Sequence, residues 1–233
     1  MNTQQLIELC HQWDVMDVLT EHKHAALDLE TLAIHTQASV VSVAVVTLGN
    51  LWKEYDSIIA YETHKNDPGV GQEPPVIDTS ILYAEWGTHA RELAMTKKCV
   101  ARKDTLDWWG KQSAKVQEAF YSEDNTWTQD LVTIGTALQE CERVWVYHPH
   151  FDIPIWDHWC EIHVLPSGIH YRAPQDAATL FNEVRQVPRV VPHQSHHALF
   201  DTLAMGLQVE LCILHKALVQ KIAYHHLKLE ITK

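Results

Sequence analysis

The stretch HAALDLETL (residues 24–32) carries two acids, Asp28 and Glu30, inside an otherwise apolar run. In a β-strand, residues i and i+2 point to the same face, so both carboxylates would lie side by side near the end of the strand. Two neighbouring carboxylates in a mostly buried position repel each other unless a cation or a proton compensates them. The stretch therefore predicts either a cation site or the solvated face of an edge strand.

The segments around this strand predict a mixed α/β fold. SVVSVAVVTL (39–48) is rich in β-branched residues and EYDSIIAYE (54–62) follows it, so together with 24–32 they predict a three-strand meander. RVWVY (143–147) predicts a further strand, and HYRA (170–173) a short one. Helical patterns cover residues 4–20, 81–95, 104–121, 126–141, 153–163, 175–186 and a long C-terminal segment with leucines every three or four residues. A meander, then strands alternating with helices, predicts a mixed sheet flanked by helices.

The 233 residues show no clear domain boundary, which predicts a single main domain. Residues 1–22 are expected to form an N-terminal helical extension, and residues 23–233 a single domain. An insertion is expected near residues 63–80, where asparagine, aspartate, glycine and proline gather.

The charge and the cysteine content indicate the cellular compartment and exclude some classes of partner. The formal net charge is −12, which argues against bulk, non-specific binding of DNA. No stretch approaches the roughly 18 uninterrupted apolar residues of a membrane span, and the start of the chain lacks the basic region of a signal peptide. The five cysteines are odd in number and form no CxxC pair. These features predict a reduced, cytoplasmic protein without a membrane partner.

Two further acids follow predicted elements. Asp152 comes after the strand 143–147, at the edge where open sheets bind their ligands. An aspartate that only caps the following helix would give the same sequence pattern. Asp201 lies near the start of the C-terminal helix, where it would face the same way as His197, four residues before it. His196 would join Asp201 only from the loop before the helix begins. The alternative is a histidine-rich helix cap with a surface pair.

The order of these signals is more specific than any one of them. D-x-E, then F-D after a strand, then H-x4-D at the start of a helix resembles the DEDDh 3′-5′ exonucleases of the ribonuclease H-like superfamily. Within it, the chain is similar to the exonuclease VIII-like and phage exonuclease A-type group, over about residues 24–215. Residues 104–113 resemble that group's T-x2-WW-x2-QS segment, and residues 171–180 its strand-to-helix segment before the last motif. The chain departs from the group at His197, where Asp or Asn is common, and in the segment before Asp152.

The resemblance implies a ribonuclease H-like fold and a role for each motif residue. Asp28, Glu30, Asp152 and Asp201 would hold two divalent cations, Mg²⁺ or Mn²⁺, which suit a site with only oxygen ligands. His196 would take the proton from the attacking water, and Glu30 would help to orient that water. Two dications would also offset the four carboxylates where a phosphate must approach.

Substrate binding is expected of residues 97–115, which carry six basic and two acidic side chains in this acidic chain. The residues predicted to bind substrate are Trp108, Trp109, Lys97, Arg102 and Lys111. Because adjacent residues point in different directions, at least one of the two tryptophans is expected in the core.

The expected activity is hydrolysis of single-stranded nucleic acid from its 3′ end, with DNA slightly favoured over RNA and with release of nucleoside 5′-monophosphates. One alternative is a 3′-5′ exoribonuclease with the same site, because a contact to the 2′-hydroxyl decides between the two substrates. The other is a non-catalytic nucleic-acid-binding or metal-binding protein on this fold, the latter in view of the 17 histidines.

Overall fold

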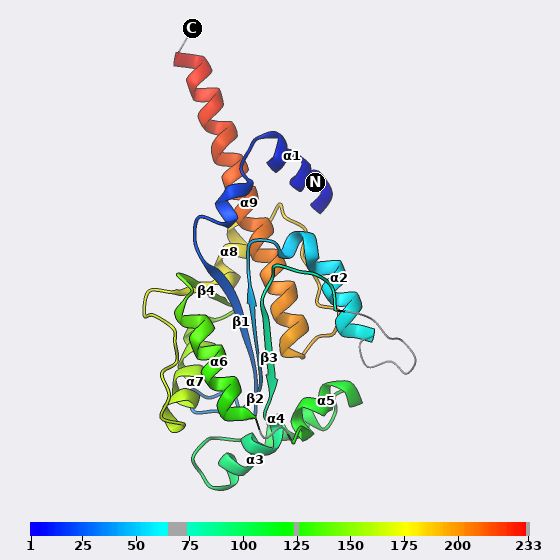
Figure 1. The fold of residues 1–233 in the computed structure, drawn as a ribbon, viewed down its shortest axis with the longest axis vertical. Coiled ribbons are helices and arrows are strands. Elements are labelled where there is room, and N and C mark those ends of the chain that lie inside the picture. The colour runs from blue at the N-terminus through cyan, green and yellow to red at the C-terminus, as the bar shows by residue number, and fades with distance from the viewer. Residues whose placement is uncertain (65–73, 124–125, 232–233) are drawn as a thin grey trace.

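The computed structural model describes residues 1–64, 74–123 and 126–231, and five strands in these ranges form one mixed sheet (Figure 1). The strand order is β3-β2-β1-β4-β5. The antiparallel part consists of β1 (His24–Thr31), β2 (Val40–Thr47) and β3 (Ile81–Glu85). The parallel part adds β4 (Arg143–Val146) beside β1 and then β5 (Pro174–Asp176). This mixed sheet with helices on both faces confirms the predicted fold class and is compatible with a ribonuclease H-like fold.

Side-chain alternation along β1 divides the core into two layers. Ala25, Leu27 and Leu29 belong to one buried cluster, whereas Ala26 belongs to the other. The first layer lies under α3 (Gly87–Met95), α4 (Lys103–Trp109), α5 (Ala114–Tyr121), α6 (Trp127–Gln139) and α7 (Pro149–Ile162). The second lies under α1 (Thr3–Gln12), the 3-10 helix η1 (Met16–Leu19), α2 (Leu51–His64), α8 (Ala177–Glu183) and α9 (Ala198–Ile231). Asp28 shares its face of β1 with Ala26, which directs its side chain toward the second layer.

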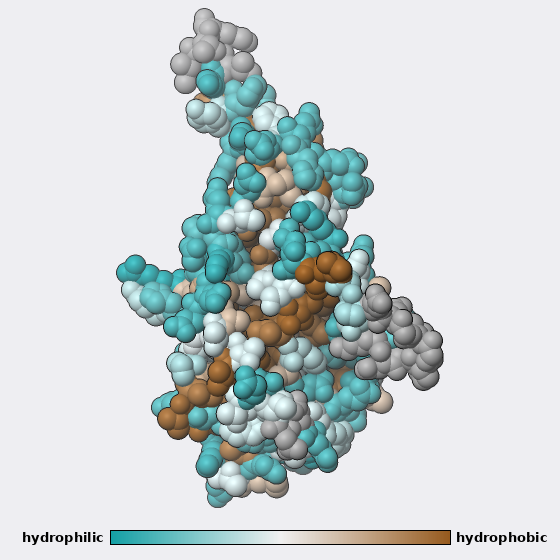
Figure 2. Space-filling model, in the orientation of Figure 1, coloured by the Kyte–Doolittle hydropathy of each residue, from teal (hydrophilic) through white to brown (hydrophobic). Residues whose placement is uncertain are grey.

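The long helix α9 is the main element of the second layer. By length and composition residues 198–228 could cross a membrane, but 72% of their most apolar window is buried inside the protein. Gly206 allows α9 to approach the sheet, because a Cβ atom there would lie 2.9 Å from a methyl group of Leu48 and 3.5 Å from the Cβ of Ala26. The far end of α9 leaves the body of the molecule, and its surface is largely hydrophilic (Figures 1 and 2). The apolar composition of α9 is therefore that of a core helix.

The third strand of the meander was predicted in the wrong place. Residues 54–62 lie within the helix α2, and the strand is β3, in the first part of a segment predicted as helix. The start of α2 is stabilised from a distance, because the buried carboxylate of Glu210 accepts hydrogen bonds from the backbone N–H groups of Gly49, Leu51 (3.2 Å) and Trp52 (2.7 Å). A helix start that is capped from α9 leaves no local signal of the kind that Ser, Thr, Asp or Asn gives.

Smaller differences affect element boundaries. The predicted helix 4–20 is split into α1 and η1 at Asp14, whose φ of 52° is incompatible with a right-handed helix. The predicted helix 104–121 is split into α4 and α5, and Ser113 caps the second part. The strand predicted at 170–173 is found at 174–176. Residues 65–73 of the predicted insertion lie outside the described residues, and the division of the chain at residue 22 stays a prediction.

The capping role of Glu210 predicts a large loss of stability on Glu210→Gln. The amide offers only one acceptor oxygen to three N–H donors and places its own N–H₂ group against them. Burial raises the pKa of Glu210 to about 7, so the carboxylate is ionised at pH 8. At that pH we expect the free energy of unfolding to fall by about 1.5–3 kcal/mol, the range for hydrogen bonds to charged groups. Urea denaturation measures this, and Glu118→Gln on the exposed side of α5 is the control, expected to change stability by less than about 0.5 kcal/mol. Equal stabilities of the two variants would contradict the cap.

Candidate functional site

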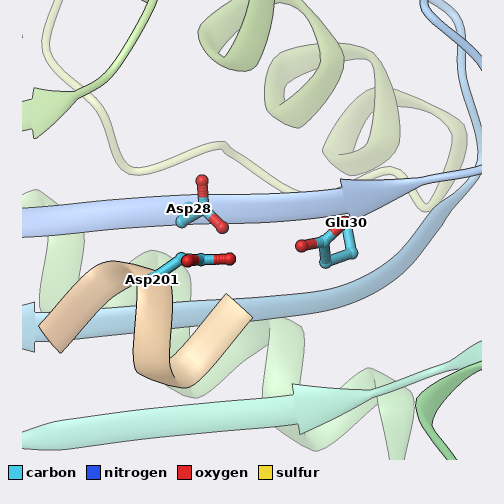
Figure 3. Close-up of side chains that lie close together, drawn as sticks. All are labelled: Asp28, Glu30 and Asp201. Atoms are coloured by element: carbon cyan, nitrogen blue, oxygen red, sulfur yellow. The ribbon is translucent and has the colours of Figure 1, made fainter. Parts of the chain in front are cut away.

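Three carboxylates meet where β1 passes beside the first turn of α9 (Figure 3). Asp28 and Glu30 project from the same face of β1, and Asp201 faces them from α9. One oxygen atom of each residue lies within 4.8 Å of the oxygens of the other two, and all three residues are partly buried. Alternation in the strand and the helix start at residue 198 thus bring these three predicted ligands together.

Asp152, the fourth predicted ligand, is not one of the three acids whose oxygens lie within 4.8 Å of one another. It stands in the first turn of α7, just after β4, and is only 6% exposed. Repulsion from its carboxylate contributes to the raised pKa of both Asp28 and Glu30. Because β4 runs parallel to β1, the chain leaves β4 at the edge of the sheet where Asp28 and Glu30 lie.

Asp152 and Asp201 are held in the same way. Each is the fourth residue of its helix, and each carboxylate accepts a hydrogen bond from the backbone N–H of the residue four positions earlier. The distances are 3.4 Å from His148 N to Asp152 Oδ2 and 3.1 Å from His197 N to Asp201 Oδ2. The positive ends of two helix dipoles therefore lie next to the acids and reduce part of their mutual repulsion.

The pKa values show that this compensation is incomplete. Burial, with repulsion from Asp201 and Asp152, raises the pKa of Glu30 to about 8. Burial and the neighbouring carboxylates raise the pKa of Asp28 well above its usual range, and burial raises that of Asp152 to about 6 and that of Asp201 in the same direction. The positive groups around these acids therefore do not offset their burial and mutual repulsion.

The donor set fits a divalent cation. The four acids offer only carboxylate oxygens, which suit hard cations such as Mg²⁺ and Mn²⁺. Ser42 lies opposite Glu30 on the same face of the sheet, and its buried hydroxyl makes no hydrogen bond to any residue that the structure describes. A bound cation and its water ligands would satisfy both the excess negative charge and this hydroxyl.

His196 lies in the loop immediately before α9, as the helix-start signal predicted. Its backbone has a φ of 62°, a left-handed conformation that costs a non-glycine residue roughly 1 kcal/mol or more. Its exposed side chain packs edge-on against Trp108, with ring centroids 4.9 Å apart. A positive charge on its imidazole would lower the pKa of Asp201.

The predicted substrate residues fall into two groups. The prediction for Trp109 is wrong, because this residue is 1% exposed and its indole N–H donates to the carbonyl of Thr31 at 3.0 Å. That burial confirms that at least one of the two tryptophans lies in the core. Trp108 is half-buried beside His196 and remains available for a substrate contact. The others, Lys97, Arg102 and Lys111, are exposed, and their role stays a prediction.

Sequence reasoning missed three groups near the acids. The ammonium group of Lys115 lies 5.8 Å from the ring centroid of Phe200 in the first turn of α9. Tyr83 and Glu85 lie on β3, and Tyr83 stacks against His197. Lys115 is part of the predicted basic segment, whereas Tyr83 and Glu85 were hidden by the helical assignment of residues 81–95.

A comparison with protein families identifies the relatives of the chain. Residues 23–212 match the 3′-5′ exoribonuclease Rv2179c-like domain. The chain belongs to this family. The matched range contains all four acids and His196, and the family supports a hydrolytic nuclease that acts in the 3′-to-5′ direction. Its description names RNA, which favours the alternative substrate over DNA. Among curated proteins no match was found.

The raised pKa values predict that the metal-free protein loses stability as the pH rises. The pKa of Glu30 is about 8 in the folded protein, whereas its ordinary value is 4.5. The folded state therefore binds this proton more tightly than the unfolded state does. As the proton is lost between pH 4.5 and pH 8, the free energy of unfolding falls. Asp28→Asn should therefore raise the melting temperature of the metal-free protein at pH 8 by about 2–4 °C.

Thermal unfolding with and without Mn²⁺ measures this effect. Mn²⁺ should stabilise the wild-type protein and stabilise Asp28→Asn much less. Asp56→Asn, at an exposed position on α2, is the control and should behave as wild type. A melting temperature of Asp28→Asn equal to that of the wild type at pH 8, with the same response to Mn²⁺, would show that the acids do not form one site.

Proposed function

We propose that the protein is a metal-dependent 3′-5′ exoribonuclease of the DEDDh type that removes nucleoside 5′-monophosphates from single-stranded RNA. The observation that carries the proposal is the convergence of Asp28, Glu30 and Asp201, with Asp152 beside them and His196 on the adjoining loop. The family match supports RNA as the substrate.

The residues divide the chemistry between them. Asp28, Glu30, Asp152 and Asp201 would hold two Mg²⁺ or Mn²⁺ ions, which would supply electrostatic stabilisation of the negative charge that develops on the phosphate. His196 accepts a proton from the water that attacks the last phosphodiester, and Glu30 orients that water. A bond forms between phosphorus and the water oxygen, the bond from phosphorus to the 3′ oxygen of the preceding nucleotide breaks, and that oxygen takes up a proton.

Strand binding uses the aromatic and basic groups around His196. Trp108 offers a half-buried indole beside the proposed base, where a nucleobase can stack. Lys115 lies over the first turn of α9 and provides a positive charge for the phosphate backbone. The exposed Lys97, Arg102 and Lys111 extend this charge along the same segment. We also propose a cytoplasmic location, supported by five cysteines that are all free and buried.

Substrate and direction are tested with labelled oligonucleotides. With Mn²⁺, 5′-labelled single-stranded RNA should shorten stepwise from its 3′ end, and a 3′-phosphate should slow this strongly. Asp28→Asn and Asp201→Asn should abolish activity, while Asp56→Asn retains it. A preference for DNA of the same sequence would overturn the RNA assignment, and cleavage of circular RNA at a comparable rate would show an endonuclease.

The role of His196 is tested against the neighbouring histidine. His196→Ala should lower kcat by roughly 10²–10⁴-fold, the usual effect of removing a general base. His197→Ala should cost much less, because the structure stacks that ring against Tyr83. Steady-state kinetics of the two variants decide the assignment, and a mild effect at His196 with a large one at His197 would exchange the roles.

A further inference from the structure

Two residues of β3 lie on the same face of the sheet as the acids of β1. Asp28 pairs with Ala44 on β2, and Ala44 pairs with Tyr83 on β3, so the three residues form one row across the sheet. Directly paired residues lie on the same face of an antiparallel sheet. Glu85, two residues beyond Tyr83, also lies on this face. Tyr83 and Glu85 are therefore on the side of the sheet that carries the acids.

A chain of contacts connects these two residues to the start of α9. The hydroxyl of Tyr83 donates a hydrogen bond to Oε1 of Glu85. The Tyr83 ring stacks against the imidazole of His197, with centroids 5.2 Å apart and an interplanar angle of 24°. The hydroxyl oxygen lies 3.4 Å from Nε2 of His197. With its hydroxyl proton directed to Glu85, Tyr83 can accept a hydrogen bond from His197 when Nε2 carries the imidazole proton.

His197 is connected through its backbone to both functional groups of this loop. Its N–H donates to Asp201 Oδ2 at 3.1 Å. Its preceding neighbour is His196, whose left-handed backbone is stable only if the surrounding structure holds it there. Fixing the side chain of His197 therefore limits the movement of the Asp201 carboxylate and of the His196 imidazole.

We propose that Tyr83 and Glu85 form a clasp on His197 that positions Asp201 for cation binding and His196 for proton transfer. Tyr83 and Glu85 are positioning residues, and neither acts on the reacting atoms. The inference rests on the proposed function. Residues that orient metal ligands and bases from behind typically change affinity or activity by 10–100-fold, and the clasp, which acts through one further residue, belongs at the lower end of that range.

The decisive variant is Tyr83→Phe, which keeps the stacked ring and removes the hydroxyl. It should lower kcat on single-stranded RNA by roughly 10-fold, leave KM within about twofold, and weaken Mn²⁺ binding measured by calorimetry by roughly 10-fold. Tyr55→Phe removes a hydroxyl from a partly buried tyrosine on α2, outside the clasp, and is the control, expected to match wild type in all three measurements.

Variants of Glu85 test whether the two residues act as a unit. Glu85→Gln keeps an acceptor for the tyrosine hydroxyl and should retain most of the activity that Glu85→Ala loses. The double variant Tyr83→Phe/Glu85→Ala should lose little more than Tyr83→Phe alone, because both changes break the same chain of hydrogen bonds. If Tyr83→Phe does not fold, the comparison of Glu85→Gln with Glu85→Ala provides the same test.

The measurements distinguish failure of the clasp from failure of the proposed function. A wild-type protein that neither binds Mn²⁺ nor degrades RNA would overturn the proposed function. An active wild type with an unchanged kcat and Mn²⁺ affinity in Tyr83→Phe or Glu85→Ala would overturn the clasp alone. A lower melting temperature without a change in these two quantities would show a purely structural role and would overturn it equally.

Discussion

Four carboxylates at one edge of the sheet repel one another. Bringing Asp28 and Glu30 next to Asp152 and Asp201 costs free energy, because each carboxylate loses water and gains a negative neighbour. The apolar layers on both faces of the sheet offset this cost. Two helix N-termini, which hold Asp152 and Asp201 by the same backbone contact, reduce it locally. The helix N-termini offset the negative charge of the site only in part, as the raised pKa values of Asp28 and Glu30 show.

The helix α9 connects this site to the core. Asp201 lies in its first turn, and Glu210, nine residues or about 14 Å further along, caps the start of α2. Between them Gly206 brings α9 close to Ala26 of β1, two residues before Asp28. One rigid element therefore sets the separation of an acid on a helix from an acid on a strand. Because packed side chains leave little freedom, a change of volume at this crossing would move Asp201 relative to Asp28.

The parts of the site that follow from local periodicity could be predicted from the sequence, and the parts set by distant contacts could not. Alternation in a strand placed Asp28 and Glu30 on one face, and a helix-start signal placed His196 in the loop before Asp201. The helix at residues 54–62 was hidden because its cap comes from Glu210, more than 150 residues away. Because the third strand was assigned to residues 54–62, the true strand β3 was assigned to a helix, and the position of Tyr83 on the sheet was missed. Two adjacent tryptophans gave no local sign of which one packs into the core.

The negative charge of the protein determines the order in which cations and substrate bind in the proposed reaction. A phosphodiester carries a negative charge and would have to approach four acids in a chain of net charge −12. At neutral pH the acids alone repel it, and the raised pKa values show that protons compete for the same oxygens. Cations remove both obstacles, because they displace the protons and reverse the local field. In the proposed reaction a strand would therefore bind after the cations, and the basic groups near Trp108 and Phe200 would orient it.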